Sequence, residues 1–334
     1  MCKVVSTVPK TRFEIFGVAI PKEWETVFID YTASDDEKIK ACEGADFLFV
    51  GSTHEVSAEV IKKTKSLRMI HVEGVGFNKV DYETAKQEGI PVCNNRASNN
   101  SAVAEHTVGL IIAALRKIPL GNIELYNRDY SEVQSEFRQK GIHELSAMHV
   151  GVIGMGEIGK ETARMLGVFG CKISYYDAYR PTTEREKELN IEFMELDNII
   201  KTCDVISLHV PVLPSTEGMI GKKQLGMMKK SALLVNTSRG ELIDQDALVA
   251  ALENGEIYCA AVDTVTPEPP AKDHPLLNMS KEASDRFIIS PHIAGTTVEA
   301  FTRMLQWAIA DFQKVLDGEM PNNIVNGVEK LKEI

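Results

Sequence analysis

Short apolar segments and helical stretches alternate along the first hundred residues of the chain. The apolar segments, rich in the residues that strands favour, are residues 3–8, 26–32, 47–51, 69–73 and 91–94. Apolar residues at helical spacing lie between some of them, at residues 58–64 and 80–87. Strands that alternate with helices form a parallel sheet with helices on both faces. This part of the chain therefore predicts an α/β domain.

A second α/β series runs from residue 149 to residue 290, between two long helical segments. Asn99, Asn100 and Ser101 can cap the first helix, residues 102–117, which is apolar nearly all round and should be buried. The second helix, residues 298–316, carries its apolar residues at helical spacing. We expect the two helices to join two domains, one formed by residues 1–101 and 297–334 and the other by residues 102–296.

Composition and charge exclude several classes of protein. Apolar residues make up 44% and charged residues 25% of the 334 residues, as in ordinary globular proteins. The net charge, 37 − 48 = −11, argues against a nucleic-acid-binding or membrane-surface protein. The longest apolar run, residues 108–115, is too short to span a bilayer, and residues 1–10 do not resemble a signal peptide. Six scattered cysteines predict reduced thiols, a cytoplasmic location and no structural zinc site.

A glycine-rich segment follows the apolar run at residues 149–153. Its residues in order are Gly154, Met155, Gly156, Glu157, Ile158 and Gly159. A helix begins there, and it should bury one face made of Ile158, Met165, Leu166 and Phe169. Gly154 suits a tight turn, Gly156 lets backbone N–H groups approach a pyrophosphate, and Gly159 allows the helix to pack closely on the strand. The segment therefore predicts a dinucleotide site at a helix N-terminus.

An acidic residue follows this segment at the spacing of a ribose-binding carboxylate. The next apolar run, residues 172–176, ends in Asp177, which is 177 − 154 = 23 residues beyond Gly154. A carboxylate there accepts hydrogen bonds from the ribose hydroxyls and repels a 2′-phosphate, which favours NAD over NADP. Arg180 leaves room for some NADP binding. The alternatives are a structural turn between strand and helix and an adenosyl-methionine site.

Polar residues follow three further buried runs of the second domain. Arg239 follows residues 232–235, Asp263 and Glu268 follow residues 259–262, and His292 follows residues 287–289. Because ligands bind at the carboxyl ends of parallel strands, we expect these side chains to converge. An arginine grips a carboxylate and an adjacent carbonyl, and a histidine that a carboxylate keeps protonated donates a proton. The set therefore predicts hydride transfer to a carbonyl that is assisted by a histidine and not by zinc.

Each of these residues also has a simpler interpretation. Arg239 could bind a surface carboxylate, Glu268 could be a solvated charge, and His292 could be a structural histidine. Taken with the dinucleotide segment, the set favours an active site. His209 lacks an acidic partner in sequence and is not assigned to catalysis, and the remaining histidines are expected to be structural or to lie on the surface.

Several segments match one family in the family's own order. They are VEGVGFNKVD, VAEHTVGLIIAALRK, VGVIGMGEIGKETARML, DVISLHVPVLPSTEGMIG, ALLVNTSRGELIDQDALVAAL and ISPHIAGTT. Over nearly its whole length the chain resembles the D-isomer-specific 2-hydroxyacid dehydrogenases. The resemblance implies two doubly wound parallel α/β domains, with a Rossmann NAD-binding domain (residues 102–296) inserted into a flavodoxin-like substrate domain (residues 1–101 and 297–334). It also implies a homodimer that acts on a small 2-keto or 2-hydroxy acid.

The resemblance also assigns roles to individual positions. Arg239, Glu268 and His292 match the catalytic residues. Positions that contact the cofactor match Gly154, Met155, Gly156, Glu157, Ile158, Gly159, Asp177, Val210, Pro211, Thr216, Thr237, Ser238, Arg239, Asp263, His292 and Gly295. The backbone of Val75 and Gly76 matches the segment that binds the substrate carboxylate, and Arg239 and His292 complete the substrate site.

Departures from relatives narrow the expected activity. Val75 stands where phosphite dehydrogenase has a lysine, and Glu268 stands where formate dehydrogenases have a glutamine. Residues 51–53 lack the arginine that 3-phosphoglycerate dehydrogenases place near the phosphate, and residues 264–267 replace the aromatic and acidic residues common before the catalytic glutamate. We expect an NAD-dependent enzyme that interconverts a small 2-keto acid and a D-2-hydroxy acid. The alternatives are an NAD(H)-sensing, corepressor-like binding protein and a short-form 3-phosphoglycerate dehydrogenase.

Overall fold

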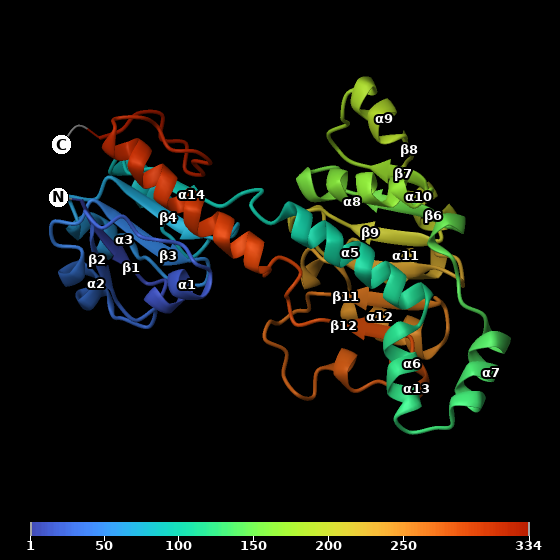
Figure 1. Cartoon of the computed structure of the whole chain (residues 1–334). Coiled ribbons are helices and arrows are strands. Elements are labelled where there is room, and N and C mark those ends of the chain that lie inside the picture. Colours follow the sequence, from blue (N-terminus) through green and yellow to red (C-terminus); the bar gives the residue numbers. More distant parts are fainter. Residues whose placement is uncertain (1, 333–334) are drawn as a thin grey trace. The chain divides into compact units, whose positions relative to one another are not determined.

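The computed structural model describes residues 2–332 and divides into two compact units (Figure 1). Unit 1 consists of Met1–Asn99 and Thr296–Ile334, and unit 2 consists of Asn100–Gly295. The domain limits expected from the sequence, after residues 101 and 296, lie one or two residues from this division. The chain therefore leaves unit 1, forms unit 2 as one continuous segment, and returns to unit 1.

Unit 1 is built on a five-stranded parallel sheet with the order β2-β1-β3-β4-β5. Its strands are β1 (Lys3–Ser6), β2 (Glu25–Phe28), β3 (Phe47–Gly51), β4 (Met69–Glu73) and β5 (Val92–Asn94). This is the strand order of the flavodoxin-like fold. The strand expected at residues 26–32 is shorter, because the Asp30 side chain accepts the Thr32 N–H over 2.8 Å and turns the chain.

Helices cover the sheet of unit 1 on both faces. They are α1 (Lys10–Ile15), α2 (Asp35–Ala41), α3 (Ala58–Lys63), α4 (Tyr82–Gln87) and α14 (Val298–Leu316). The sequence pattern predicted the bounds of α14. This helix packs on β4, and the Phe312 ring stacks on the Phe47 ring with centroids 4.6 Å apart. The last segment of the chain thus contributes to the same core as the first strands.

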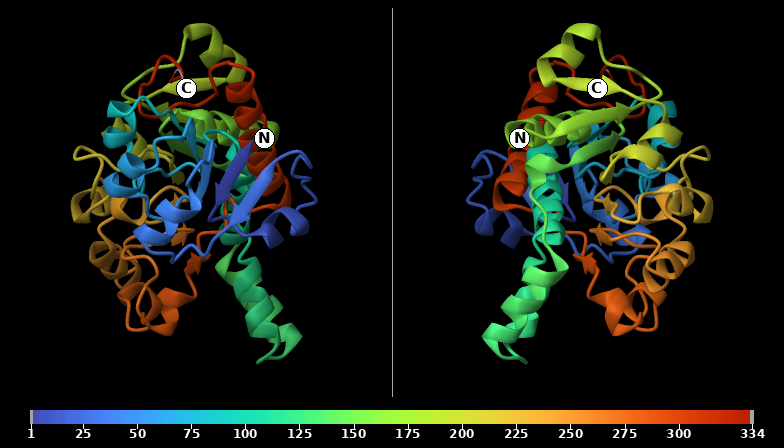
Figure 2. Two further views of the ribbon diagram at one scale, coloured as in Figure 1. Left: turned by 90° about the vertical axis from the view of Figure 1, so that its left-hand side faces the viewer. Right: turned by 90° about the vertical axis from the view of Figure 1, so that its right-hand side faces the viewer.

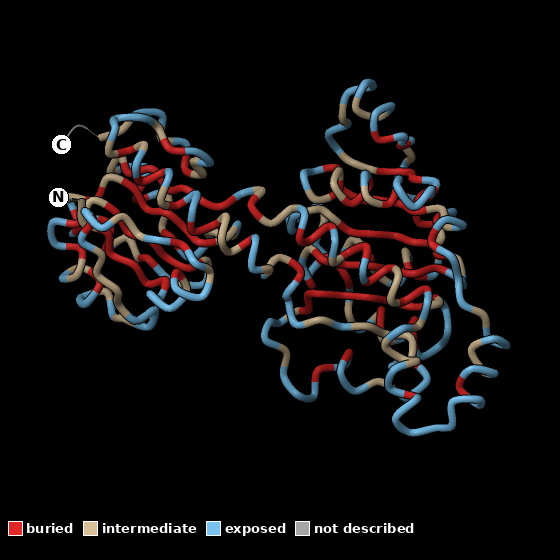
Figure 3. Tube along the Cα trace, in the orientation of Figure 1, coloured by how far each residue is buried: buried red, intermediate tan, exposed pale blue. Residues whose placement is uncertain are grey.

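Unit 2 is built on a seven-stranded parallel sheet with the order β12-β11-β10-β9-β6-β7-β8. Its strands are β6 (His149–Ile153), β7 (Lys172–Tyr176), β8 (Ile191–Phe193), β9 (Val205–Leu208), β10 (Leu233–Asn236), β11 (Cys259–Val262) and β12 (Phe287–Ile289). The strand order reverses direction between β6 and β9, as in a Rossmann fold. The two doubly wound α/β domains expected from the sequence are confirmed. Most strands of each sheet are buried, as their red colour in Figure 3 shows, whereas β2 and β12 at the sheet edges are only partly buried.

The helices of unit 2 show where the sequence pattern was incomplete. They are α5 (Asn100–Leu115), α6 (Ile118–Leu125), α7 (Tyr130–Lys140), α8 (Glu157–Val168), α9 (Thr183–Leu189), α10 (Leu196–Thr202), α11 (Lys222–Met227), α12 (Gln245–Glu253) and α13 (Lys281–Ser284). The expected helix 102–117 ends instead at Leu115, because Lys117 has a φ of +53° and Pro119 starts α6. The sequence analysis missed α6 and α7, which are largely exposed and extend from the rest of unit 2 (Figures 2 and 3).

Helix α8 buries only part of the expected face, since Leu166 is buried and Phe169 is not. Phe169 is 47% exposed, because α8 ends at Val168 and Phe169 only caps it. The buried residues of α8 are Gly159, Thr162, Ala163 and Leu166, which let the helix approach the sheet and α5 closely. Among the helices of residues 2–332, none combines the length and the apolar character needed to cross a bilayer.

Candidate active site

The glycine-rich loop lies between β6 and α8, at the carboxyl edge of the seven-stranded sheet. Gly154 has a φ of +100°, and a Cβ there would stand 2.5 Å from the His209 carbonyl oxygen. A Cβ on Gly159 would stand 1.9 Å from the Gly154 carbonyl oxygen, whereas a Cβ on Gly156 would meet no atom within 4 Å. Gly154 and Gly159 are thus required by the packing of the loop. Gly156 borders open space at the N-terminus of α8, where an anionic pyrophosphate fits.

Asp177 lies directly beside this loop. Its Oδ2 accepts the Met155 N–H over 2.5 Å, and its Oδ1 accepts the Tyr179 N–H over 2.7 Å. Nearby, Arg180 donates to Glu186 Oε1 over 3.0 Å, and its guanidinium lies over the Phe193 ring. Asp177 therefore places a carboxylate next to the loop, while Arg180 is bound to other partners.

The segment that follows β9 packs against the glycine loop, at the point where the strand order reverses. A Cβ on Gly154 would also stand 2.9 Å from Val210 Cγ1, so Val210 packs against the loop. The Thr216 hydroxyl accepts the Leu213 N–H over 2.8 Å and donates to the Pro211 carbonyl over 2.6 Å, which ties together the turn that follows β9.

His209 lies under the glycine loop and has no acidic partner. Its Nε2 bonds to the Ser207 hydroxyl over 2.8 Å, and its Nδ1 is buried without a hydrogen-bond partner in the structure of residues 2–332. Burial lowers the pKa of His209 to about 4, so the ring is neutral near pH 7. A neutral, enclosed imidazole packs against the loop and is not an acid for catalysis.

Arg239 follows β10 on a loop that is fixed by the side chains of Asn236 and Ser238. The Asn236 side chain donates to the Arg239 carbonyl over 2.8 Å and accepts the Ser238 N–H over 3.0 Å. The Ser238 hydroxyl reaches back to the Leu208 carbonyl over 2.9 Å. The Arg239 side chain is exposed and donates from Nη1 to the Ser238 carbonyl over 2.7 Å, which leaves other N–H donors of the guanidinium for a ligand.

Glu268 and His292 come together although 24 residues separate them. His292 Nδ1 lies 2.7 Å from Glu268 Oε1 and 2.9 Å from Oε2, and each side chain is 42% exposed. An ionised carboxylate only accepts, so Nδ1 carries the donated proton and Nε2 is the ring nitrogen free to meet a substrate. The pair is therefore an imidazole that a carboxylate orients through Nδ1.

Side chains of unit 2 hold the backbone of the segment that carries Glu268. Gln245 donates to the Thr266 carbonyl over 2.6 Å and accepts the Thr266 N–H over 3.2 Å. His274 Nε2 lies 3.1 Å from the same carbonyl. A Cβ on Gly240 would stand 2.2 Å from the Val265 carbonyl carbon, so the loop of Arg239 and the loop of Glu268 pack directly on each other.

Asp263 holds the backbone around His292. The Asp263 carbonyl accepts the His292 N–H over 2.8 Å, its Oδ1 accepts the Ile293 N–H over 3.0 Å, and its Oδ2 accepts the Ala294 N–H over 2.9 Å. One buried residue thus holds three consecutive backbone N–H groups. His292 needs this support because its φ of +52° is unfavourable for a residue other than glycine.

The structure places most of the predicted residues at one edge of one sheet. Asp177 contacts the glycine loop, Glu268 contacts His292, and Asp263 holds the segment from His292 to Ala294. Arg239 is on the same edge, and no hydrogen bond or ion pair of residues 2–332 joins it to Glu268 or His292. Val75 and Gly76 belong to unit 1, so their part in substrate binding stays a prediction.

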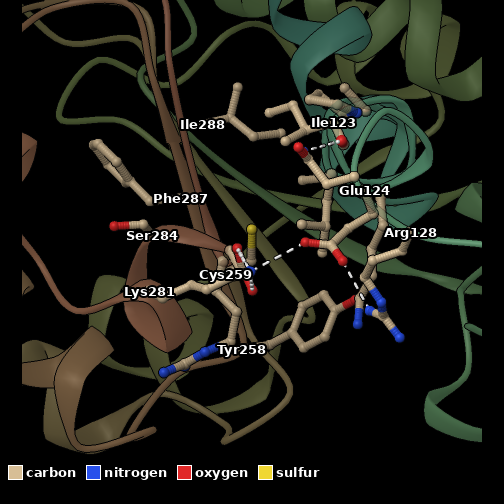
Figure 4. Close-up of a pocket in the computed structure, with 17 residues that line it drawn as sticks. Ile123, Glu124, Arg128, Tyr258, Cys259, Lys281, Ser284, Phe287 and Ile288 are labelled. Atoms are coloured by element: carbon tan, nitrogen blue, oxygen red, sulfur yellow. Dashed lines mark hydrogen bonds and ion pairs between the residues drawn. The ribbon is translucent and has the colours of Figure 1, made fainter. Parts of the chain in front are cut away.

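A cavity of unit 2 lies away from these loops (Figure 4). It has a volume of about 440 Å³ and is lined by Tyr258, Cys259 and Phe287, where β11 and β12 begin. Glu124 pairs with Arg128 over 2.8 Å on one side of it and with Lys281 over 3.1 Å on the other. The catalytic loops follow the opposite ends of the same strands, so this cavity is not part of the candidate active site.

Comparison with known proteins identifies the family. Residues 108–294 match the family model described as D-isomer specific 2-hydroxyacid dehydrogenase, NAD binding domain. The chain belongs to this dehydrogenase family. The resemblance expected from the sequence is thus confirmed, and the family model supports NAD as the cofactor, as expected from the glycine loop and Asp177.

Individual relatives of the family agree with this assignment. A glyoxylate reductase of Thermofilum pendens is 36% identical over 93% of this chain and 91% of its own length. A D-3-phosphoglycerate dehydrogenase of Methanocaldococcus jannaschii is 38% identical over 93% of this chain, which spans only 57% of that relative. The NAD-complexed D-isomer specific 2-hydroxyacid dehydrogenase of Lactobacillus delbrueckii ssp. bulgaricus aligns over 97% of this chain and 100% of its own, with 27% identity and a TM-score of 0.81.

Proposed function

We propose that the protein interconverts a small 2-keto acid and a D-2-hydroxy acid with NAD. The observation that carries the proposal is the His292–Glu268 pair, which stands on the same sheet edge as a dinucleotide loop. The relatives named glyoxylate reductase and hydroxypyruvate reductase, each 33% identical or more, support the same chemistry.

The proposed mechanism gives each side chain one task. Bound NADH supplies the hydride that adds to the carbonyl carbon of the keto acid. Arg239 holds the carboxylate and the carbonyl oxygen with its planar set of N–H donors. His292 gives its Nε2 proton to that oxygen as negative charge develops there, and Glu268 keeps the ring oriented through Nδ1. In the reverse direction neutral His292 takes the hydroxyl proton.

The cofactor contacts are proposed from the geometry of the loop and from the family resemblance. The backbone from Gly154 to Gly159 would hold the pyrophosphate, and Asp177 would accept the ribose hydroxyls. The other proposed contacts follow β9, β10, β11 and β12; they are Val210, Pro211, Thr216, Thr237, Ser238, Asp263 and Gly295.

Substrate binding is proposed to involve the loop that follows β4 in unit 1. The backbone N–H groups of Val75 and Gly76 would hold the substrate carboxylate, as the family resemblance implies. The loop after β3 carries no arginine at residues 51–53, which disfavours a phosphorylated substrate. A small, unphosphorylated keto acid such as glyoxylate or hydroxypyruvate is therefore the proposed substrate.

A substrate panel tests the proposed function. NADH oxidation would be followed with glyoxylate, hydroxypyruvate, pyruvate and phosphohydroxypyruvate, and we expect the highest kcat/KM among the unphosphorylated acids. Preference for phosphohydroxypyruvate would show a 3-phosphoglycerate dehydrogenase instead. Absence of turnover, with NADH bound, would support the sensor alternative.

The pH profile of the same reaction tests the roles of His292 and Glu268. Reduction needs protonated His292, so kcat/KM should fall as the pH rises. Glu268→Gln removes the carboxylate that holds Nδ1 and should lower kcat/KM for reduction across this profile. If chemistry limits the rate and both profiles coincide, another group orients His292.

We further propose that the protein acts as a cytoplasmic homodimer. All six cysteines are free, which suits a reducing compartment. Helices α6 and α7 expose apolar side chains that a second copy of the chain would cover; Ile123 is 57%, Tyr126 83% and Tyr130 64% exposed. Light scattering should give twice the chain mass for the wild type, and a monomer for Tyr126→Glu combined with Ile123→Glu. A monomeric wild type would contradict the proposal.

A further inference from the structure

A chain of three side chains connects the loop of His292 with helix α5. The Ser290 hydroxyl donates to Asp263 Oδ1 over 2.5 Å, and Ser290 Oγ lies 2.9 Å from His106 Nε2. A serine hydroxyl has one proton to donate, so its oxygen accepts from His106. The direction of both bonds is therefore fixed, from His106 to Ser290 to Asp263.

The carboxylate at the end of this chain depends on such donors. Asp263 is 1% exposed, and no lysine or arginine of residues 2–332 forms an ion pair with it. His106 Nε2 lies 3.5 Å from its Oδ1. A buried carboxylate without a cation is stable only when hydrogen-bond donors surround it. Loss of the His106 donor would thus weaken the residue that holds the His292 backbone.

The next residue of α5 reaches the loop of Arg239. The Thr107 hydroxyl donates to the Val103 carbonyl over 2.7 Å, so it accepts from the Thr237 hydroxyl, which lies 2.8 Å away. Thr237 precedes Arg239 by two residues. Helix α5 packs on β10, β11 and β12, the strands that lead into the three catalytic loops. Two consecutive side chains therefore bind two different loops of the site.

We propose that helix α5 fixes the two catalytic loops relative to each other, with His106 as the positioning residue for His292 and Thr107 as the positioning residue for Arg239. This inference rests on the proposed function, because it assigns both loops to one reaction. Neither side chain is required to touch the substrate. Each acts through a hydroxyl of the loop that it holds, Ser290 in one case and Thr237 in the other.

His106→Phe tests the first half of the proposal. Phenylalanine keeps an aromatic ring and removes the donor, so kcat for reduction should fall about tenfold, the order expected for one lost hydrogen bond next to a charged group. The Kd for NADH should change less than kcat does, because the glycine loop that would hold the pyrophosphate is not linked to His106. His106→Gln restores an N–H donor and should recover most of kcat. If the His106 side chain only filled space, His106→Phe and His106→Gln would have the same kcat.

His149→Phe is the matched control. His149 Nε2 makes the same kind of bond, to the Ser174 hydroxyl over 2.8 Å, at the start of β6 and away from the catalytic loops. His149→Phe should lower Tm as much as His106→Phe does and leave kcat unchanged. Equal losses of kcat in His106→Phe and His149→Phe, or a wild-type kcat in His106→Phe, would overturn the role of His106. If His106→Phe does not fold, Ser290→Ala removes the same link and takes its place in the comparison.

Thr107→Val tests the second half. Loss of the hydroxyl should raise KM for the keto acid about tenfold, because Arg239 grips the carboxylate, with a smaller change in kcat. Thr107→Ser keeps the hydroxyl and should behave as the wild type. If Thr107→Val keeps the wild-type KM, Thr107 does not position Arg239.

A measurement without substrate separates this inference from the proposed function. The His292 ring Cε1–H resonance, assigned by its loss in His292→Gln, would be compared by NMR in the apo wild type, His106→Phe and His149→Phe. We expect it to shift or broaden in His106→Phe only, and an unchanged resonance would overturn the positioning role. A wild type that reduces no keto acid would refute the proposed function, while the NMR comparison would still decide whether α5 positions His292.

Discussion

The carboxyl edge of the seven-stranded sheet has two halves that bind in different ways. After β6, the chain presents backbone, because Gly154 and Gly159 are fixed by contacts that leave no space for a Cβ, and the Asp177 carboxylate that follows β7 lies beside this loop. After β10, β11 and β12, it presents the side chains of Arg239, Glu268 and His292. The first half is a shaped surface for a cofactor, and the second is a set of chemical groups.

The difference extends to the two histidines of this edge. His209 is neutral because burial lowers its pKa to about 4, and it supports the glycine loop. His292 is 42% exposed and pairs with Glu268. The same residue type is a packing element in one half and, in the proposed mechanism, a proton donor in the other, and its environment decides which. Substitutions in the two halves should therefore fail in different assays.

The largest effect is expected for His292→Ala. Removal of the proton donor should lower kcat by about 10³-fold in both directions, within the range of general acid catalysis. The Kd for NADH, measured by fluorescence titration, should change little, because the cofactor half is intact. His143→Ala, at an exposed histidine, is the control. A parallel loss of NADH binding in His292→Ala would show that the two halves do not act separately.

Arg239→Lys should have the next largest effect, a decrease of about 10²-fold in kcat/KM. This is the order seen when one positioned donor is removed from an active site. Lysine keeps the charge and loses the planar pair of N–H donors that holds a carboxylate and a carbonyl together. Arg164→Lys, on the exposed side of α8, controls for the exchange of residue type. Steady-state kinetics with near wild-type kcat/KM would place Arg239 outside the substrate site.

His209 should affect stability and not chemistry. Its pKa is about 4 in the folded protein, against an ordinary value of 6.5. Above pH 6.5 neither state binds the proton, and as the pH falls towards 4 the unfolded chain binds it first, so stability is lost. The contribution between pH 7 and pH 5 is about 2 kcal/mol of unfolding free energy.

Denaturant unfolding at both pH values measures this contribution. His209→Asn should lose about 2 kcal/mol less than the wild type between pH 7 and pH 5. His143→Asn, at an exposed histidine, should keep the wild-type difference. Identical pH dependence in wild type and His209→Asn would mean that folding does not lower the pKa of His209.

The smallest effect is expected for Asp177→Ser. The wild type should prefer NADH, because the Asp177 carboxylate opposes a 2′-phosphate, and the serine variant should narrow that preference about tenfold in kcat/KM. Arg180 is already bound to Glu186, so it should not rescue NADPH use by itself. Equal kcat/KM for NADH and NADPH in the wild type would remove Asp177 from this role.

The sequence predicted the cofactor half more completely than the supports of the catalytic half. Strand, glycines, helix and Asp177 follow one another within 29 residues, so their contacts are local and leave a pattern. His106 and Ser290 are 184 residues apart, and nothing near either residue indicates that they meet. The failed expectation for Phe169 has a related cause: periodicity gives a helical face but not where the helix ends. Helices α6 and α7 were missed because their exposed apolar residues follow no buried stripe.

The hold of Asp263 on three consecutive N–H groups has a consequence for hydrogen exchange. Residues 292 and 293 lie on the surface, where loop amides ordinarily exchange with solvent deuterium within seconds, yet their N–H groups point to a buried residue. Their exchange should instead be as slow as that of the neighbouring strands. The His292 imidazole would then be exposed to solvent on a backbone that rarely opens. Substrate could therefore bind at this exposed surface while His292 is already in the position that the proposed reaction requires.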